Sequence, residues 1–254
     1  MNVLTLEYDI QWQNTDANLA YLEEEIAKVQ HVKIDIIILP ELFHCGFGAD
    51  ISCAEIMHGT THRWMQLIAQ RYDTLVIGSV MIKEKGKLYN RCIAQHPDGK
   101  YQTYDKIHLF CQGIVPENTQ FTKGSSTTII YWRGVKIMPL ICFDIRFPAT
   151  SMNYTLNNEY AYDLLVYVAN WPAARQHAWD TLLPARAIEN QSYVIGVNRT
   201  GTDKNSIKYS GNTASYDAAG NPLRTQILSP VCSLIYIDIE KIQEFRVNYP
   251  FLDK

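Results

Sequence analysis

The stretch G-V-K-I-M-P-L-I-C-F-D-I-R-F-P, Gly134 to Pro148, decides how the rest of the chain is interpreted. Its apolar run from Val135 to Ile141 predicts a buried strand that ends at Cys142. Pro148 suits the first turn of a following helix. α/β folds often place reactive groups at such strand-to-helix turns, because backbone N–H groups there can face an anion. On this stretch alone, Cys142 is either a nucleophile or an ordinary buried cysteine, and other segments must decide.

The composition favours one enzyme-sized domain and excludes several classes of partner. With 254 residues and 47% hydrophobic content, the chain is expected to fold as a single domain, 1–254, around one sizeable core. The net charge is only -3, and acidic and basic residues are interspersed. We therefore expect neither nucleic acid nor a membrane surface as a partner. A small molecule or a second copy of the chain fits better.

Cysteine usage and the N-terminal segment predict a reducing, cytoplasmic location. The six cysteines are scattered and form no C-x-x-C pair, which argues against a disulfide framework and a zinc ribbon. The chain starts with a strand-like pattern rather than a signal peptide, and it contains no run of about 18 apolar residues.

The first forty residues predict a β-α-β unit that ends beside a carboxylate. Val3 to Tyr8 and Ile34 to Leu39 are apolar, strand-like runs. Between them, Asp16 to Gln30 has apolar positions at helical spacing, with Thr15 or Asp16 as the expected cap. Glu41 follows the second strand directly and is a candidate acid or base. Most glutamates in such places are merely solvated, so Glu41 needs partners to support this role.

Two histidines near the start of the next predicted helix could in principle bind a metal ion. Thr60 to Arg71 is predicted to be helical, capped by Thr60 or Thr61 and with Trp64, Leu67 and Ile68 facing inward, before a strand at Thr74 to Met81. His58 and His62 are four residues apart, the spacing of a ligand pair on one helix face. No third ligand accompanies them, so we interpret both as surface histidines and expect no metal.

Lys106 stands in the segment Y-D-K-I-H-L-F, which follows a predicted hairpin of Lys87 to Gln95 and Tyr101 to Tyr104. A lysine among aromatic and apolar residues is costly to bury without a partner. Either Lys106 reaches solvent along its stem, or it meets a buried carboxylate and serves chemistry. His108 could instead act on Cys142 as a papain-like base, although nothing around it separates it from an ordinary histidine.

The segment from Cys111 to Gly124 has little periodicity and is predicted to be a long, functional loop. Glu117 is its only carboxylate. Beyond Cys142, the sequence predicts several further elements. They are a helix at Ala149 to Leu156, a buried strand at Asp163 to Ala169, a helix at Arg175 to Gln191 that Pro184 must kink or divide, and strands at Tyr193 to Asn198, Thr213 to Tyr216, Leu223 to Leu228 and Val231 to Ile237.

Glu41, Lys106 and Cys142 stand in three segments that together resemble a known family. P-E-L-F, Y-D-K-I-H-L-F and L-I-C-F-D-I-R-F-P resemble, in order, the signature segments of the nitrilase, or carbon-nitrogen hydrolase, superfamily. A-N-W-P and A-R-A-I-E-N-Q resemble its later landmarks, so the resemblance covers nearly the whole chain. It implies an α/β fold of four layers, an α-β-β-α sandwich. It also implies no metal or organic cofactor, and association into a homodimer or larger homo-oligomer.

The same resemblance assigns the catalytic residues. It implies that Cys142 is the nucleophile, Glu41 the general base and Lys106 the third member of a Glu-Lys-Cys triad. Glu117 would take the place of the second glutamate that many members carry. The backbone N–H of Phe143 and the ammonium of Lys106 would stabilise an oxyanion.

The substrate is narrowed by a further resemblance, to the omega-amidase branch, which C-F-D-I-R-F-P, V-A-N-W-P and A-R-A-I-E-N-Q carry. That branch hydrolyses the terminal amide of short dicarboxylic monoamides such as 2-oxoglutaramate and 2-oxosuccinamate. An arginine suits the far carboxylate of such a small-molecule amide substrate, and Arg146 is the first candidate and Arg175 the second. Either arginine could instead make a structural ion pair. Trp171 and Phe43 could wall the pocket, or they could simply pack in the core.

Other functions stay open from the sequence. A carbamoyl-amide hydrolase, an aliphatic amidase or a nitrilase would use the same triad on another substrate. A non-catalytic binding protein could have kept the fold, although the intact triad argues against it. A papain-like hydrolase would need His108 or another histidine as its base.

Overall fold

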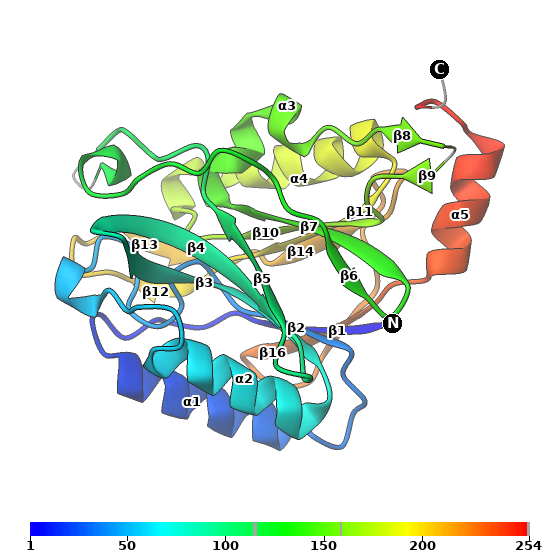
Figure 1. The fold of residues 1–254 in the computed structure, drawn as a ribbon. Coiled ribbons are helices and arrows are strands. Elements are labelled where there is room, and N and C mark those ends of the chain that lie inside the picture. The colour runs from blue at the N-terminus through cyan, green and yellow to red at the C-terminus, as the bar shows by residue number, and fades with distance from the viewer. Residues whose placement is uncertain (114–115, 158, 253–254) are drawn as a thin grey trace.

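Two β-sheets stack face to face, and helices cover both outer surfaces (Figure 1). The computed structural model describes residues 1–113, 116–157 and 159–252. Helices α1 (Thr15–Lys28) and α2 (Thr60–Tyr72) cover one sheet, and α4 (Gln176–Asn190), with the short α3 (Pro148–Ser151), covers the other. The predicted four-layer α-β-β-α sandwich is therefore confirmed.

Within the part of the chain that the structure describes, the first sheet has seven strands and combines strands from the N-terminal and the C-terminal parts of the chain. In spatial order they are β15 (Thr225–Ile227), β16 (Cys232–Tyr236), β1 (Asn2–Leu6), β2 (Ile36–Ile38), β3 (Leu75–Glu84), β4 (Lys87–Gln95) and β5 (Tyr101–Asp105). β1, β2 and β3 are parallel, with Val3 opposite Ile36 and Ile36 opposite Leu75. This arrangement confirms the β-α-β unit. β16 runs antiparallel to β1, so the C-terminal part completes the N-terminal sheet.

The second sheet has five strands and delivers Cys142. Its order is β14 (Ala214–Tyr216), β11 (Tyr193–Val197), β10 (Leu164–Val168), β7 (Val135–Ile141) and β6 (Ile130–Trp132). β7, β10 and β11 are parallel, so their carboxyl ends lie at one edge. Two short antiparallel pairs stand apart from both sheets: β8 (Thr155–Leu156) with β9 (Glu159–Tyr160), and β12 (Thr200–Thr202) with β13 (Lys208–Ser210).

Apolar side chains fill the space between the layers. One core cluster joins the inner faces of both sheets, with Ile36 and Leu75 from the first and Val166 from the second. Another lies between the first sheet and helices α1 and α2. β-branched residues in central parallel strands are buried on both faces, which explains the continuous apolar runs in the sequence. The strand ends, by contrast, carry the polar residues of the site.

Several local predictions around the first two helices were wrong. Asn14, not Thr15 or Asp16, caps α1 by accepting a hydrogen bond from the N–H of Ala17. α2 begins after Gly59, and Glu55 from outside the helix accepts the N–H of Thr61 at 2.8 Å. A carboxylate placed by tertiary structure thus replaces the predicted local cap.

The predicted facing of α2 also needs two corrections. Leu67 is 58% exposed rather than inward-facing. His62 is buried rather than on the surface, and its Nε2 lies 2.8 Å from Oε1 of Gln95. Burial lowers the pKa of His62, so the neutral imidazole is favoured there. Within the described residues, no group of three or more His, Cys, Asp or Glu side chains is placed to hold a metal ion.

Helix α4 runs through Pro184 as one element, so Pro184 does not begin a new segment, which was one of the two predicted alternatives. Its inward side chains, among them Trp179 and Leu183, pack over Gly196 of β11, where a Cβ would lie only 2.6 Å from the Trp179 ring. This close packing offsets the loss of one helix hydrogen bond at the proline.

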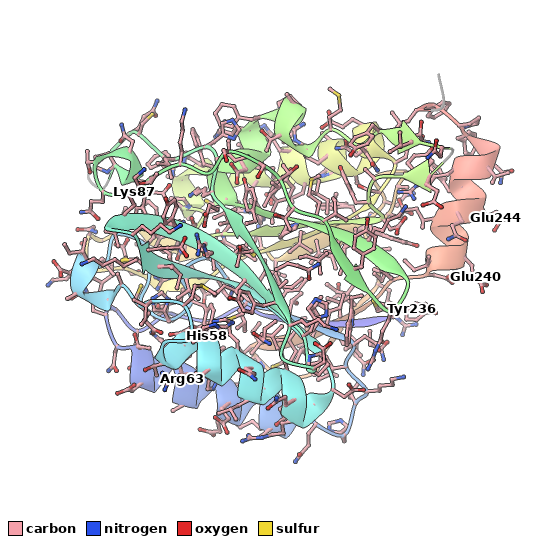
Figure 2. All side chains as sticks on the ribbon, in the orientation of Figure 1. His58, Arg63, Lys87, Tyr236, Glu240 and Glu244 are labelled. Carbon is pink, nitrogen blue, oxygen red and sulfur yellow. The ribbon has the colours of Figure 1, made fainter. Side chains whose placement is uncertain are left out.

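The predicted helix at Ala149 to Leu156 is only the four-residue α3 followed by β8. Helix α5 (Ile239–Asn248) was not predicted; it turns Ile242 inward and carries Glu240 and Glu244 on its outer side (Figure 2). No helix among the described residues is long and apolar enough to cross a membrane. Of the predicted loop from Cys111 to Gly124, Ile114 and Val115 lie outside the described residues.

Candidate active site

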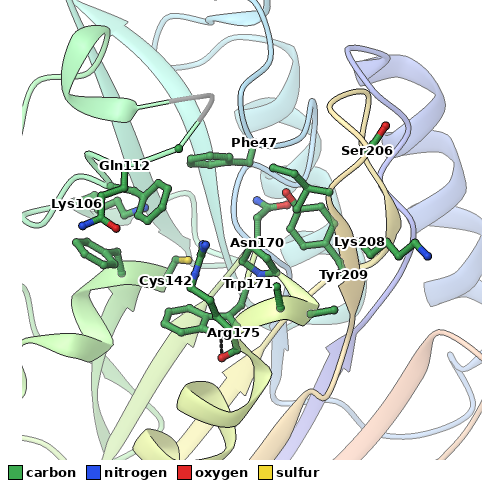
Figure 3. Close-up of a pocket in the computed structure, with 17 residues that line it drawn as sticks. Phe47, Lys106, Gln112, Cys142, Asn170, Trp171, Arg175, Ser206, Lys208 and Tyr209 are labelled. Atoms are coloured by element: carbon green, nitrogen blue, oxygen red, sulfur yellow. Dashed lines mark hydrogen bonds between the residues drawn. The ribbon is translucent and has the colours of Figure 1, made fainter.

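Cys142 lies at the carboxyl end of β7, on the wall of a cavity of about 670 Å³ (Figure 3). It begins the 3-10 turn Cys142–Arg146, and its φ is +46°, in the left-handed region that non-glycine residues rarely adopt. Its side chain is only 8% exposed. A strained residue at a strand end that opens into a cavity is typical of a functional position.

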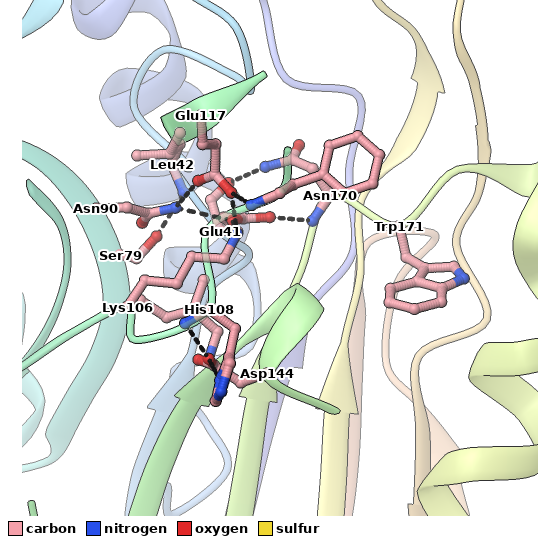
Figure 4. Close-up of polar contacts among 12 residues, drawn as sticks. Glu41, Leu42, Ser79, Asn90, Lys106, His108, Glu117, Asp144, Asn170 and Trp171 are labelled. Atoms are coloured by element: carbon pink, nitrogen blue, oxygen red, sulfur yellow. Dashed lines mark hydrogen bonds and ion pairs between the residues drawn. The ribbon is translucent and has the colours of Figure 1, made fainter. Parts of the chain in front are cut away.

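Asp144 holds this turn in place. Its Oδ2 accepts hydrogen bonds from the N–H of Ile141 at 3.0 Å and from the hydroxyl of Tyr104 at 2.8 Å. Its Oδ1 accepts the N–H of His108 at 2.9 Å (Figure 4). The buried carboxylate therefore ties the turn of Cys142 to the segment that carries Lys106.

His108 has a structural environment of its own. Its Nδ1 lies 3.0 Å from Oδ1 of Asp144, and its ring stacks on Phe147 with the centroids 3.7 Å apart. The papain-like hypothesis needs a histidine that serves the thiol of Cys142. These contacts give His108 a different partner, so they do not favour that hypothesis.

Lys106 lies between two buried carboxylates, Glu41 and Glu117 (Figure 4). Its Nζ is 2.7 Å from Oε1 of Glu41 and 2.7 Å from Oε2 of Glu117. Glu41 follows β2, Lys106 follows β5, and Glu117 begins a short 3-10 turn. The lysine does not reach solvent, because its side chain is fully buried. The sequence left open whether Lys106 reaches solvent or meets a buried carboxylate, and the structure shows that it meets two.

The charges in this cluster shift one another's pKa values. Burial by itself would lower the pKa of Lys106, but the carboxylates of Glu117 and Glu41 outweigh it and raise that pKa. Burial raises the pKa of Glu117, against the opposing effect of Lys106. The pKa of Cys142 is also well above its ordinary value, first because of burial and then because of Glu41. Cys142 therefore rests as a thiol and needs a base to be activated.

Two asparagines that the sequence analysis did not single out complete the polar cluster. Nδ2 of Asn90 lies 2.8 Å from Oε1 of Glu41 and 3.0 Å from Oε1 of Glu117. The backbone N–H of Asn170 donates to Oε2 of Glu41 at 2.8 Å. The sequence does hint at both residues. Asn90 is a small polar residue within the predicted strand Lys87 to Gln95. Asn170 directly follows a buried strand, as Glu41 does.

The cavity beyond Cys142 has aromatic walls and a cation at its rim. Phe143, Trp171 and Arg175 line it, as do Phe47 and Tyr209 (Figure 3). The guanidinium of Arg175 lies 4.8 Å from the ring centroid of Phe110 and 6.0 Å from that of Trp171. The cavity thus brings together the thiol of Cys142, the ammonium of Lys106 and the guanidinium of Arg175, and the carboxylates of the buried cluster lie behind Lys106.

Two predicted substrate-binding residues do not line this cavity. Phe43 is fully buried between the first sheet and α2, with its ring centroid 6.0 Å from that of Trp64. Arg146 is exposed and is not among the residues that line the cavity, although its guanidinium lies 5.2 Å from the Trp171 ring. Arg175, the second candidate, does line the cavity.

Comparison with known proteins places this geometry in a family. The family model described as carbon-nitrogen hydrolase matches residues 5–246. The chain belongs to the carbon-nitrogen hydrolase family, and it is a hydrolase acting on non-peptide carbon–nitrogen bonds.

Three individual proteins make the comparison more specific. The omega-amidase YafV of Escherichia coli (strain K12) is 34% identical over 98% of this chain and 94% of its own length. The 2-oxoglutaramate amidase of Bacillus subtilis (strain 168) is 29% identical over 98% of this chain and 95% of its own. The crystal structure of XC1258, a CN-hydrolase superfamily protein from Xanthomonas campestris with an arsenic adduct in its active site, has a TM-score of 0.92. It is 32% identical, over 99% of this chain and 96% of that one.

Proposed function

We propose that this protein hydrolyses the terminal amide of a short dicarboxylic monoamide, such as 2-oxoglutaramate or 2-oxosuccinamate, to the acid and ammonia. The observation that carries the proposal is the buried cluster of Glu41, Lys106 and Glu117 beside the thiol of Cys142, in a cavity that Arg175 lines. The relatives described as omega-amidase and 2-oxoglutaramate amidase support the choice of substrate.

The first half of the reaction is acylation of Cys142. Glu41 takes the thiol proton as the sulfur attacks the amide carbon, because a thiol with a raised pKa is not ionised in advance. The negative charge that forms on the carbonyl oxygen is stabilised by the ammonium of Lys106 and the backbone N–H of Phe143. One such donor is typically worth roughly 100-fold to 1000-fold in rate. Glu41 then returns the proton to the nitrogen, the C–N bond breaks, and ammonia leaves a thioester on Cys142.

The second half is hydrolysis of that thioester. A water molecule attacks the thioester carbon while Glu41 takes one of its protons. The same two donors stabilise the second oxyanion. When the C–S bond breaks, the sulfur regains the proton from Glu41 and the carboxylic acid is released. Glu117 keeps Lys106 charged and in place, since its carboxylate is the strongest influence that raises the pKa of Lys106.

Arg175 is the residue we propose to bind the far carboxylate of the substrate. A guanidinium forms strong, paired hydrogen bonds with a carboxylate. The rings of Phe110 and Trp171 on either side hold its position. Trp171 also donates from Nε1 to the backbone carbonyl of Arg175 at 2.8 Å, which fixes the start of the segment that leads into α4.

We also propose the setting in which the enzyme works. One domain spanning 1–254 is supported by the single family match over residues 5–246 and by the pairing of β1 with β16. A cytoplasmic location is supported by six cysteines that all carry free thiols. Assembly into a homodimer or larger homo-oligomer rests on the family resemblance alone.

A substrate panel tests the proposal. Ammonia release would be measured from 2-oxoglutaramate and succinamate, beside butyramide, a carbamoyl-amine and an aliphatic nitrile, for the wild type and for Cys142→Ala. We expect 2-oxoglutaramate to be preferred and its hydrolysis to vanish in the variant. Preference for the nitrile or the carbamoyl-amine would replace the proposed substrate class while leaving the thiol chemistry in place.

A further inference from the structure

Asn90 is a fully buried polar residue in strand β4 that touches both carboxylates of the charged cluster (Figure 4). The strand pairs with β3 on one side and β5 on the other, which fixes the backbone of Asn90. Asn90 does not line the cavity. Its side chain can therefore act on the reaction through the two carboxylates that it binds.

The hydrogen bonds fix which way the Asn90 amide faces. Both carboxylates only accept, so the group 2.8 Å from Glu41 and 3.0 Å from Glu117 must be the NH₂, which has one N–H for each. The amide oxygen then points away, and it has no partner among the described residues. The chain leaves this buried acceptor unsatisfied, at a cost of about 1–3 kcal/mol, and keeps both donors on the carboxylates.

A neutral donor has a specific use between these two residues. Glu41 and Glu117 place two carboxyl groups against the single ammonium of Lys106, and all three side chains are buried. The ammonium of Lys106 donates to Oε1 of Glu41 and to Oε2 of Glu117. Asn90 bridges the two Oε1 atoms, and so fixes the rotation of both carboxylates about their own axes. It does so without adding a charge that would change the proton balance of the cluster.

We infer that Asn90 is a positioning residue, whose amide holds Glu41 in line with the Cys142 thiol and ties it to Glu117. The inference rests on the proposed roles of Glu41 and Glu117. It predicts two separable effects. Asn90→Ala removes both donors, so kcat falls roughly 100-fold while KM changes less than about threefold. Asn90→Asp keeps the shape but brings in a third carboxylate, which makes the cluster bind a proton more readily.

The decisive readout is the pH dependence of kcat/KM for 2-oxoglutaramate. We expect its acid limb to move up by about one pH unit or more in Asn90→Asp, because the base must lose its proton next to two other carboxylates. A purely structural asparagine would not move this limb. Asn153→Asp is the matched control, since Asn153 is equally buried but donates to the backbone carbonyls of Tyr162 and Asn190, away from the cavity. It should lower stability and leave the acid limb in place.

Asn90→Ser keeps the inference testable if Asn90→Asp does not fold. A serine hydroxyl has one donor, so kcat should fall in the order wild type, Asn90→Ser, Asn90→Ala. An unmoved acid limb in folded Asn90→Asp, or kcat within threefold of wild type in Asn90→Ala, would overturn the inference. Cys142→Ala separates this failure from that of the proposed function. If it abolishes ammonia release, the thiol mechanism stands even when Asn90 proves unimportant, and if it does not, the proposed function fails first.

Discussion

Asn170 binds Glu41 twice, with its backbone N–H to the carboxylate at 2.8 Å and with its side-chain Nδ2 to the backbone carbonyl at 2.6 Å. Glu41 follows β2 of the first sheet, and Asn170 follows β10 of the second. These bonds join the two sheets at the edge where their parallel strands end. A base from one sheet is thereby held beside the thiol that β7 of the other sheet delivers.

The first prediction concerns the buried ion cluster. Lys106→Met leaves Glu41 and Glu117 without their cation, and removing one partner of a buried pair costs about 3–5 kcal/mol. Urea unfolding at pH 7 measures this loss, and hydrolysis should disappear as well. Lys136→Met is the control, because its partner Glu159, at 3.3 Å, has a largely exposed carboxylate, so that the pair is worth at most about 1 kcal/mol. Equal losses in the two variants would mean that the cluster is not stabilised by Lys106.

A second prediction follows from the raised pKa of Cys142. The buried thiol keeps its proton in the folded state, but in the unfolded chain it ionises near its ordinary pKa of 9.0. Its contribution to stability is therefore complete below about pH 9 and is lost as the pH rises from there towards the raised pKa of the folded state.

Urea unfolding between pH 8 and pH 11 measures the effect of this thiol. Above pH 9 the unfolding free energy of the wild type should fall faster than that of Cys142→Ala, by about 1.4 kcal/mol per pH unit. Cys111→Ala, which removes an exposed thiol, should run parallel to the wild type. Parallel curves for wild type and Cys142→Ala would show that the Cys142 thiol ionises as freely in the folded protein as in the unfolded chain.

Arg175 provides a prediction about specificity. Arg175→Met removes the proposed partner of the distal carboxylate, a charge-assisted hydrogen bond of about 1.5–3 kcal/mol, so KM for 2-oxoglutaramate should rise roughly 10-fold to 100-fold. Hydrolysis of butyramide, which has no carboxylate, should hardly change. Arg146→Met is the natural control, because Arg146 is not among the residues that line the cavity. A larger effect from Arg146→Met would reverse this assignment.

Asp144 is predicted to matter for both folding and rate. Asp144→Ala leaves the buried hydroxyl of Tyr104 and the N–H of Ile141 without their acceptor, at about 1–3 kcal/mol for each. The turn that presents Cys142 should also lose its geometry, which lowers kcat roughly 100-fold. Thermal melting and the rate of Cys142 alkylation by iodoacetamide measure the two effects. Asp217→Ala, in a surface turn, serves as comparison, and an unchanged alkylation rate in Asp144→Ala would contradict the role of this clamp.

Much of the architecture could be predicted because local patterns and tertiary structure agree there. The apolar runs before Glu41 and before Cys142 are β2 and β7, as their patterns indicate. Pro184 does not divide α4, because packing of Trp179 and Leu183 on β11 outweighs a local helix-breaking tendency. Helix α5 was missed, since its residues carry only a weak apolar stripe around Ile242.

The site was less predictable where geometry decides. Order along the chain drew attention to Glu41, Lys106 and Cys142, but it could not tell whether Lys106 is buried. Arg146 and Arg175 have the same chemistry, and only the folded structure shows that Arg175 lines the cavity and Arg146 does not. Asn90 looked like one polar residue in a strand, because a bridge between two carboxylates exists only once three distant segments are brought together.

The central claim, that Cys142 carries the acyl group, can be tested by direct observation of the intermediate. The enzyme would be mixed with 2-oxoglutaramate, quenched in acid within milliseconds to seconds, digested and analysed by mass spectrometry. The account predicts an added acyl group on the peptide that contains Cys142, formed together with a burst of ammonia and absent from Cys142→Ala. Ammonia release without any such adduct, or release that persists in Cys142→Ala, would contradict it.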